Sequence, residues 1–172
     1  MGEKTRGYLT VEATITLTAF LFMMMFLMNM GQIYRTQNYV IHGLLQSGKS
    51  VAFSSYEYKQ NSAVETIVKV IEMLCMGEVG ADNEIAAYCR AEQYDKAVKK
   101  AFGYCAGKNP VETSAVLQKY GVSGGIDGIR LNGKKEGKNI VITAEYDIQL
   151  PFAFFGFDHV TMHQRVKCGL WS

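Results

Sequence analysis

The first residues in the chain that could do chemistry form a phosphate-binding pattern. Gly43 to Ser50 reads Gly-Leu-Leu-Gln-Ser-Gly-Lys-Ser, a literal match to G-x-x-x-x-G-K-[ST]. Such a loop binds phosphate only between a strand and a helix, where backbone N–H groups and the helix N-terminus face the anion. Here a long helical pattern precedes it and no series of parallel strands follows. We therefore interpret Gly43, Gly48, Lys49 and Ser50 as a chance match and expect no nucleotide-binding site.

The four cysteines are the next candidates, and their chemistry would be redox chemistry. They are Cys75, Cys89, Cys105 and Cys168, with no C-x-x-C pair to indicate a zinc site. In a domain outside the cytoplasm they permit two disulfides in one of three connectivities, and the alternative is buried, reduced thiols. Cys168 lies in the apolar register of the last predicted strand, so a helix packed on that strand would supply its partner.

No catalytic group of residues emerges from the remaining polar side chains. His159 and His163 share a face of a predicted strand but lie about 13 Å apart along it, too far for one metal ion. With His42, we expect them at solvated or edge positions, and the chain has no nucleophile motif such as G-x-S-x-G. The sequence therefore predicts no enzyme, no metal, no cofactor and no small-molecule substrate.

The charge pattern points instead to a membrane. The chain has 18 basic and 16 acidic residues, a net charge of +2 that gives no reason to propose nucleic acid as a partner. From Ala13 to Tyr34 there is no charged residue. As a helix this run would span about 33 Å, roughly one hydrocarbon core, and it is longer than the apolar part of a cleavable signal peptide. Lys4 and Arg6 precede it, which favours a cytoplasmic N-terminus and an extracytoplasmic C-terminal part.

Glu12 is the exceptional residue of this segment, because it lies at the head of the membrane helix. A carboxylate at the bilayer centre costs about 2.5–3.5 kcal/mol on insertion scales, and less near the interface. One interpretation places Glu12 at the headgroups, stabilised by the helix dipole and Arg6. The other requires a cationic partner elsewhere in an assembly.

The residues before Glu12 carry a family resemblance. The string Gly7-Tyr-Leu-Thr-Val-Glu12 resembles a type IV prepilin processing site: a short basic leader ends in glycine, and an apolar helix follows. The resemblance implies that a prepilin peptidase cuts between Gly7 and Tyr8. It also implies that Glu12, then fifth in the mature chain, pairs with the new N-terminal amine of a neighbouring subunit.

Within that family, Gly7 to Ala13 looks most like the TadE-like pseudopilins of tight-adherence pilus systems. Those proteins have a proline about six residues after the glutamate, where this chain has Thr18, so we expect an unkinked helix. The resemblance implies a membrane-anchored minor subunit whose partners are the membrane, the prepilin peptidase and other pilus subunits. The alternative, from another class, is an unprocessed signal-anchored ectodomain that binds a ligand or an envelope partner.

Helical periodicity and capping residues outline the helices that would position these groups. Apolar residues at helical spacing predict one long helix from about Tyr8 to Ser55. Shorter helices are expected from Ser62 to Gly77, from Asn83 to Cys105, and from Asn109-Pro110 to Tyr120.

The period then changes to the alternation of strands. We predict an antiparallel meander over 126–132, 139–150 and 159–171, with a turn at 132–139 and Pro151 ending the second strand. The aromatic turn that contains Phe152, Phe154, Phe155 and Phe157 is interpreted as core or inter-subunit packing. The expected fold is α+β: a long N-terminal membrane-spanning helix, further helices and a small C-terminal three-stranded antiparallel sheet. The expected segments are a leader (1–7), a transmembrane helix (8–34), its continuation (35–60) and a head (61–172).

Overall fold

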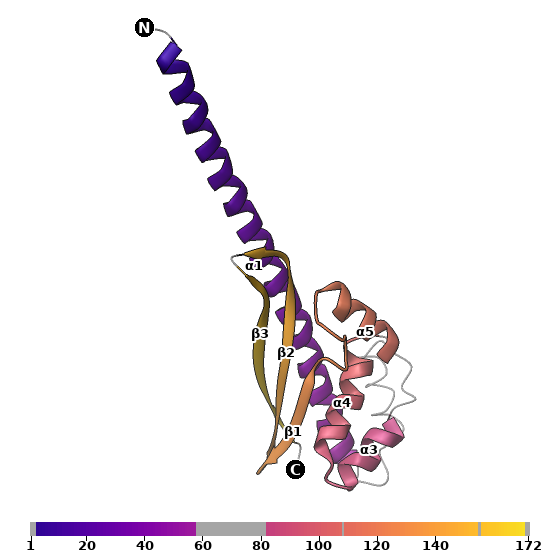
Figure 1. Ribbon diagram of the computed structural model, residues 1–172. Helices are drawn as coiled ribbons and strands as arrows, with labels where there is room; N and C mark the ends of the chain where they lie inside the picture. Colours follow the sequence, from indigo (N-terminus) through magenta and orange to yellow (C-terminus); the bar gives the residue numbers. More distant parts are fainter. Residues whose placement is uncertain (1–2, 58–81, 108, 155, 171–172) are drawn as a thin grey trace.

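The computed structural model describes residues 3–57, 82–107, 109–154 and 156–170. This part of the chain holds helices and then an antiparallel sheet, so the predicted α+β class is confirmed (Figure 1). The predicted helix Ser62 to Gly77 lies outside the described residues. The elements are α1 (Glu3–Glu57), α3 (Asp82–Arg90), α4 (Tyr94–Cys105), α5 (Pro110–Lys119), β1 (Arg130–Glu136), β2 (Asn139–Phe154) and β3 (Phe157–Gly169).

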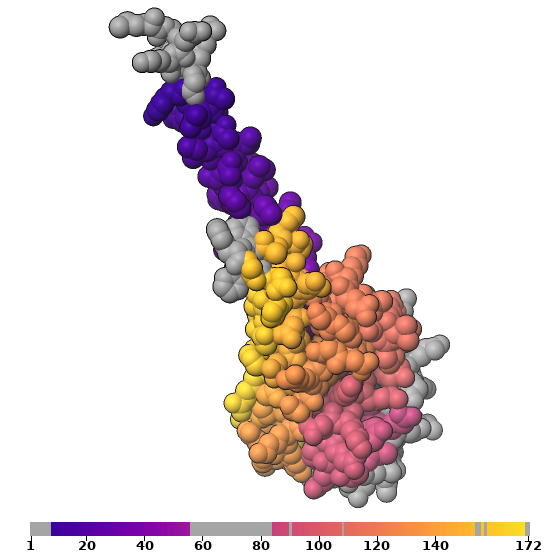
Figure 2. All heavy atoms as spheres, viewed as in Figure 1, coloured from indigo at the N-terminus to yellow at the C-terminus, as the bar shows by residue number. Residues whose placement is uncertain are grey.

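Helix α1 is continuous, as its sequence predicts. Its first half stands away from the rest of the molecule, and its second half runs through the head formed by the other elements (Figures 1 and 2). Thr18 occupies the position where a proline would have kinked the helix, and α1 passes through it without a break.

The core of the head is built around the second half of α1. Val40, Leu44 and Val51 are fully buried there. They belong to one apolar cluster with residues of α4 and of the sheet, among them Ala101, Phe102, Ile140, Ile142 and Ile148. The head therefore cannot be separated from α1, because the helix supplies one wall of its only described core cluster.

The sheet has the order β1-β2-β3, with both pairs antiparallel. The predicted alternation is confirmed for one face of the second strand, on which Ile140, Ile142, Ala144, Tyr146 and Ile148 are buried. Two residues depart from it: Val141 on the other face is also buried, and Leu150 is only half-buried. Burial raises the pKa of Tyr146 to about 12, and Gln164 on β3 offsets only part of that rise. The inner face of the sheet is thus a dry surface against which α1 packs.

The first hairpin corrects the predicted turn at 132–139. β1 continues to Glu136, which pairs with Asn139, so the turn consists of Gly137 and Lys138, with Gly137 at φ +61°. Gly133, which suggested a turn, serves close packing instead. A Cβ there would lie 2.9 Å from the backbone oxygen of Tyr94 on α4.

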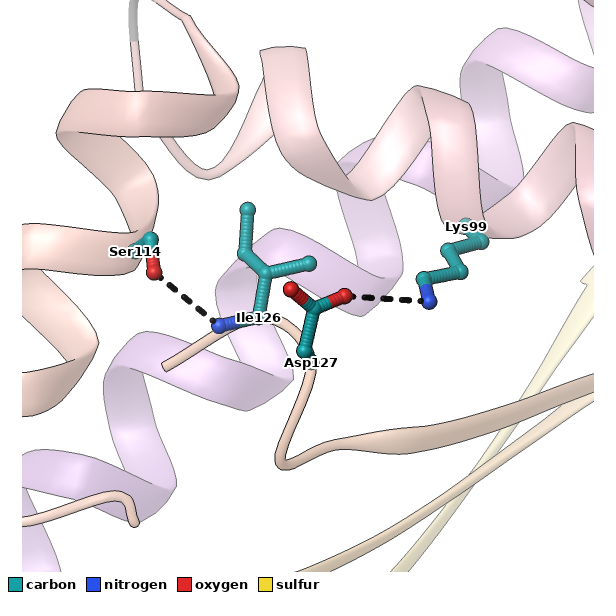
Figure 3. A network of polar contacts seen from close by, with 4 residues as sticks. All are labelled: Lys99, Ser114, Ile126 and Asp127. Atoms are coloured by element: carbon teal, nitrogen blue, oxygen red, sulfur yellow. Dashed lines mark hydrogen bonds and ion pairs between the residues drawn. The ribbon is translucent and has the colours of Figure 1, made fainter. Parts of the chain in front are cut away.

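The predicted start of the first strand at residue 126 is also wrong. Residues 126–129 form a turn before β1 begins at Arg130. Ile126 is buried, and its backbone N–H donates to Ser114 Oγ (3.4 Å), while Asp127 pairs with Lys99 on α4 (3.3 Å; Figure 3). These two contacts attach residues 126 and 127 to α5 and α4. The apolar residues that predicted a strand here therefore face the helices.

Two further boundaries differ from prediction. The helix expected from Asn83 to Cys105 is divided into α3 and α4 by a left-handed residue, Glu92 (φ +55°). Neither glycine nor proline marks that break. Strand β2 continues past Pro151 to Phe154. The pairing with β3 is irregular between Gln149 and Phe154, so the N–H group that proline lacks is not needed for a hydrogen bond between the strands.

Candidate functional site

The most unusual surface of the molecule is the first half of α1. From Tyr8 to Met28, every residue except Met25 is exposed, although most are large and apolar (Figure 2). The helix is long and apolar enough to cross a membrane, and none of its most apolar stretch is buried by the rest of the chain. Exposed apolar surface of this extent is unfavourable in water, and the helix is a candidate membrane span.

The polar residues of this half are suited to that surrounding. The hydroxyls of Thr14, Thr16 and Thr18 each donate to the carbonyl oxygen four residues earlier, at 2.8–2.9 Å. Their donors are therefore satisfied within the helix. Glu12 is exposed and lies just before these threonines in the helix. The Gly7–Tyr8 bond also lies within α1, and Gly7 is five residues before Glu12. Glu12 is therefore solvent-exposed and makes no contact with the head that the structure describes.

A row of polar side chains on α1 marks where the exposed half ends, and sequence reasoning missed it. Asn29 exchanges two hydrogen bonds with the backbone of Phe152 on β2: its Nδ2 donates to the carbonyl oxygen (2.9 Å), and its Oδ1 accepts from the N–H (3.3 Å). Gln32 Nε2 and Thr36 Oγ1 both donate to the carbonyl oxygen of Tyr120, at 3.2 and 2.8 Å. We call Asn29, Gln32 and Thr36 the polar row.

The next residue on this face is Tyr39, and it extends the attachment to α4. Its hydroxyl donates to the carbonyl oxygen of Ala106 (2.6 Å), and its ring meets the Tyr120 ring edge-on at 5.4 Å. Burial, with Tyr120 nearby, raises the pKa of Tyr39. The spacing 29, 32, 36 and 39 is the helical one, so a search for polar residues at that period could have found this face.

The polar row shows that the head begins directly where the exposed segment ends. Asn29 and Gln32 lie within the segment 8–34 that the sequence assigned to the membrane, yet both are bonded to the head. The uncovered part of α1 is therefore 8–28, about 31 Å of helix and still the thickness of a hydrocarbon core.

We expect Asn29→Leu to destabilise the head by about 1–3 kcal/mol, because it leaves the N–H and C=O of Phe152 unpaired at a largely buried position. The exposed Asn38, nine residues along the same helix, is the matched control. Asn38→Leu should change stability by no more than about 0.5 kcal/mol. Thermal unfolding of the full chain in detergent, followed by near-ultraviolet circular dichroism, compares the two. Equal melting temperatures would show that the polar row does not hold the head to α1.

The phosphate-binding pattern lies in the interior of α1. Gly43 faces α4: a Cβ there would lie 2.7 Å from the Phe102 ring and 2.9 Å from the Ala106 methyl group. Gly48 faces the sheet, beside the Cys168 thiol and Ile142. Ser50 is buried and Lys49 is exposed. The two glycines thus have a packing reason, since they let a helix and a sheet approach opposite sides of α1.

The three cysteines that the structure describes lie in different surroundings. Cys89 on α3 is buried and Cys168 on β3 is half-buried against Gly48 of α1, and each has a free thiol whose pKa is raised by burial. Cys105 is half-buried at the end of α4. Cys75 lies outside the described residues. The expected contact of Cys168 with a helix is present, and its disulfide pairing stays a prediction.

The histidines lie where the sequence placed them, at exposed positions. His42 is on α1, His163 is on the outer face of β3, and His159 Nδ1 lies 2.7 Å from Asp158 Oδ1. Within the described ranges, no three histidine, cysteine or acidic side chains lie close enough together to hold a metal ion.

Comparison with known proteins identifies no relative. No protein-family model, no curated protein and no solved structure matches the chain.

Proposed function

We propose that this chain is a membrane-anchored minor pilin or pseudopilin of a tight-adherence-type surface pilus. One observation carries the proposal. A single continuous helix is exposed and mostly apolar over residues 8–28, apart from the half-buried Met25, and carries an exposed carboxylate at Glu12. Its second half forms one wall of the head. A subunit that must lie in a bilayer and later pack side by side with other subunits needs this arrangement.

The division of α1 explains how the parts would work together. The exposed half 8–28 provides a surface that lipid covers before assembly and that neighbouring helices cover after it. The second half of α1 joins the exposed half directly to the head, with no flexible linker between them. The polar row and the core cluster hold the head against this same helix, so the head moves with it. The N-terminus would lie in the cytoplasm and the head outside it, in accordance with Lys4 and Arg6.

Maturation by the prepilin peptidase gives the sharpest test. In cells with an active peptidase, intact-mass spectrometry of the purified chain should show loss of residues 1–7, with Tyr8 as the new N-terminus. Gly7→Asp should abolish this cleavage, while the circular dichroism of the head remains unchanged. Cells in which the peptidase has been inactivated provide the control, because the leader should be retained there.

Retention of Met1 to Gly7 in the presence of active peptidase would contradict the proposal. It would favour the alternative of an unprocessed, signal-anchored ectodomain that binds an envelope partner. The same preparation shows whether the head has folded, so a failed cleavage cannot be confused with a misfolded substrate.

A further inference from the structure

The hairpin that joins β2 and β3 has a composition that the head does not explain. From Gln149 to Phe157 the chain has no charged residue and contains four phenylalanines. Charged residues flank the run at Asp147 and Asp158. Ala153 is exposed and Phe152 is only half-buried. A run of this kind at the end of a hairpin is costly in water and favourable in the headgroup region of a bilayer.

The direction of β2 brings this hairpin to the membrane end of α1. Gly48 of α1 lies beside Ile142, and Asn29 of α1 is bonded to Phe152. Nineteen residues of helix cover about 28 Å and ten residues of strand about 33 Å, so strand and helix run antiparallel side by side. Figure 1 shows the result: the β2–β3 turn is the part of the sheet nearest the uncovered half of α1.

The contact between Asn29 and Phe152 also gives the position of the hairpin along the membrane normal. If Tyr8 lies at one edge of the hydrocarbon core, the helix reaches the other edge after about 30 Å, which is residue 28. Phe152 is bonded to the next residue, Asn29, and β2 runs two residues further before it turns. Met25, one turn before Asn29 on the same face, is the single half-buried residue between Tyr8 and Met28. Tyr34, 65% exposed, with Arg35 beside it, adds interfacial side chains at this level.

From this geometry we infer that the β2–β3 hairpin is a second membrane contact, lying in the lipid interface beside the point where α1 leaves the bilayer. The occupant is lipid, because the exposed Pro151 and Ala153 flank Phe152, which is bonded to Asn29 at the point where the uncovered apolar surface of α1 ends. Two contacts would fix the tilt and the rotation of the head, which a single spanning helix leaves free. The inference uses the membrane-spanning part of the proposed function and does not depend on pilus assembly.

The test is depth-dependent quenching of single tryptophans by brominated lipids, with the full chain in phosphatidylcholine–phosphatidylglycerol vesicles. The native Trp171 is first replaced by phenylalanine. Ala153→Trp reports the hairpin, and Leu17→Trp reports the spanning helix. Lys138→Trp is the matched control, because it places a tryptophan on the other hairpin turn, at the opposite end of the same sheet.

We expect Ala153→Trp to lose about half of its fluorescence, most strongly with bromines near the headgroups, as for an interfacial aromatic residue. Leu17→Trp should be quenched most by bromines near the bilayer centre, and Lys138→Trp should not be quenched. Quenching at Leu17→Trp without quenching at Ala153→Trp would overturn this inference and leave the proposed function intact. Equal quenching of Ala153→Trp and Lys138→Trp would also overturn it, since tryptophan alone would then explain the contact. Quenching at neither Leu17→Trp nor Ala153→Trp would overturn both proposals.

Discussion

Replacing Gly43 by alanine is expected to destabilise the head by about 1–3 kcal/mol, the usual cost of forcing an extra group into a packed core. The added methyl group would lie 2.7 Å from the Phe102 ring and 2.9 Å from the Ala106 methyl group. Neither neighbour can move freely, since Phe102 is fully buried and the Ala106 methyl group is fixed to the backbone. The effect is measured as the free energy of unfolding of the full chain in detergent.

The same helix provides the matched control. A Cβ at Gly31 would meet nothing within 4 Å, so Gly31→Ala should be neutral or should stabilise by up to about 1 kcal/mol through helix propensity. Phe102→Leu should recover part of the loss in a Gly43→Ala background, because it removes the ring that causes the clash. An equal response of Gly31→Ala and Gly43→Ala would contradict the packing explanation.

This comparison also separates packing from phosphate binding. Lys49 is exposed, so Lys49→Ala should change stability by no more than about 0.5 kcal/mol. A phosphate-binding loop would behave in the opposite way, with magnesium-dependent ATP affinity that is lost in Lys49→Ala. Micromolar affinity of that kind would overturn our interpretation of residues 43–50.

Replacing Glu12 by glutamine is expected to lower the fraction of the chain in assembled complexes by at least about tenfold, which corresponds to about 1.4 kcal/mol of association free energy. Glutamine keeps the shape of the side chain but cannot pair ionically with the amine of a neighbouring subunit, and a charge pair in an apolar surrounding depends on both partners. The measurement is the ratio of chain in sheared surface fibres or cross-linked complexes to chain in the membrane.

Two controls make this result specific. Glu92→Gln changes an exposed glutamate of the head and should assemble normally. Blocking cleavage with Gly7→Asp should produce the same defect as Glu12→Gln, and the double variant should be no worse, because the amine exists only after cleavage. Additive defects, or normal assembly of Glu12→Gln, would show that Glu12 pairs with something other than the new N-terminus.

The sequence alone determined the elements whose signals are local. The apolar run after Glu12 predicted the first half of α1, and strict alternation predicted the buried face of β2 from Ile140 to Ile148. At α5, Asn109 and Pro110 predicted the start, and the Asn109 side chain does accept from the Glu112 N–H at 2.7 Å. These features depend on neighbours a few residues apart, so the order of the residues is sufficient.

The tertiary structure decided what depends on contacts between distant residues. Glycines at 43, 48 and 133 resemble a loop or turn signal in sequence, yet in the fold they are places where a second element approaches the backbone. The break at Glu92 and the attachment of Asn29 to Phe152, 123 residues away, have no local signal. Asn29 fixes the position of the β2–β3 hairpin along α1, because a buried asparagine must find its hydrogen-bond partners wherever the chain brings them.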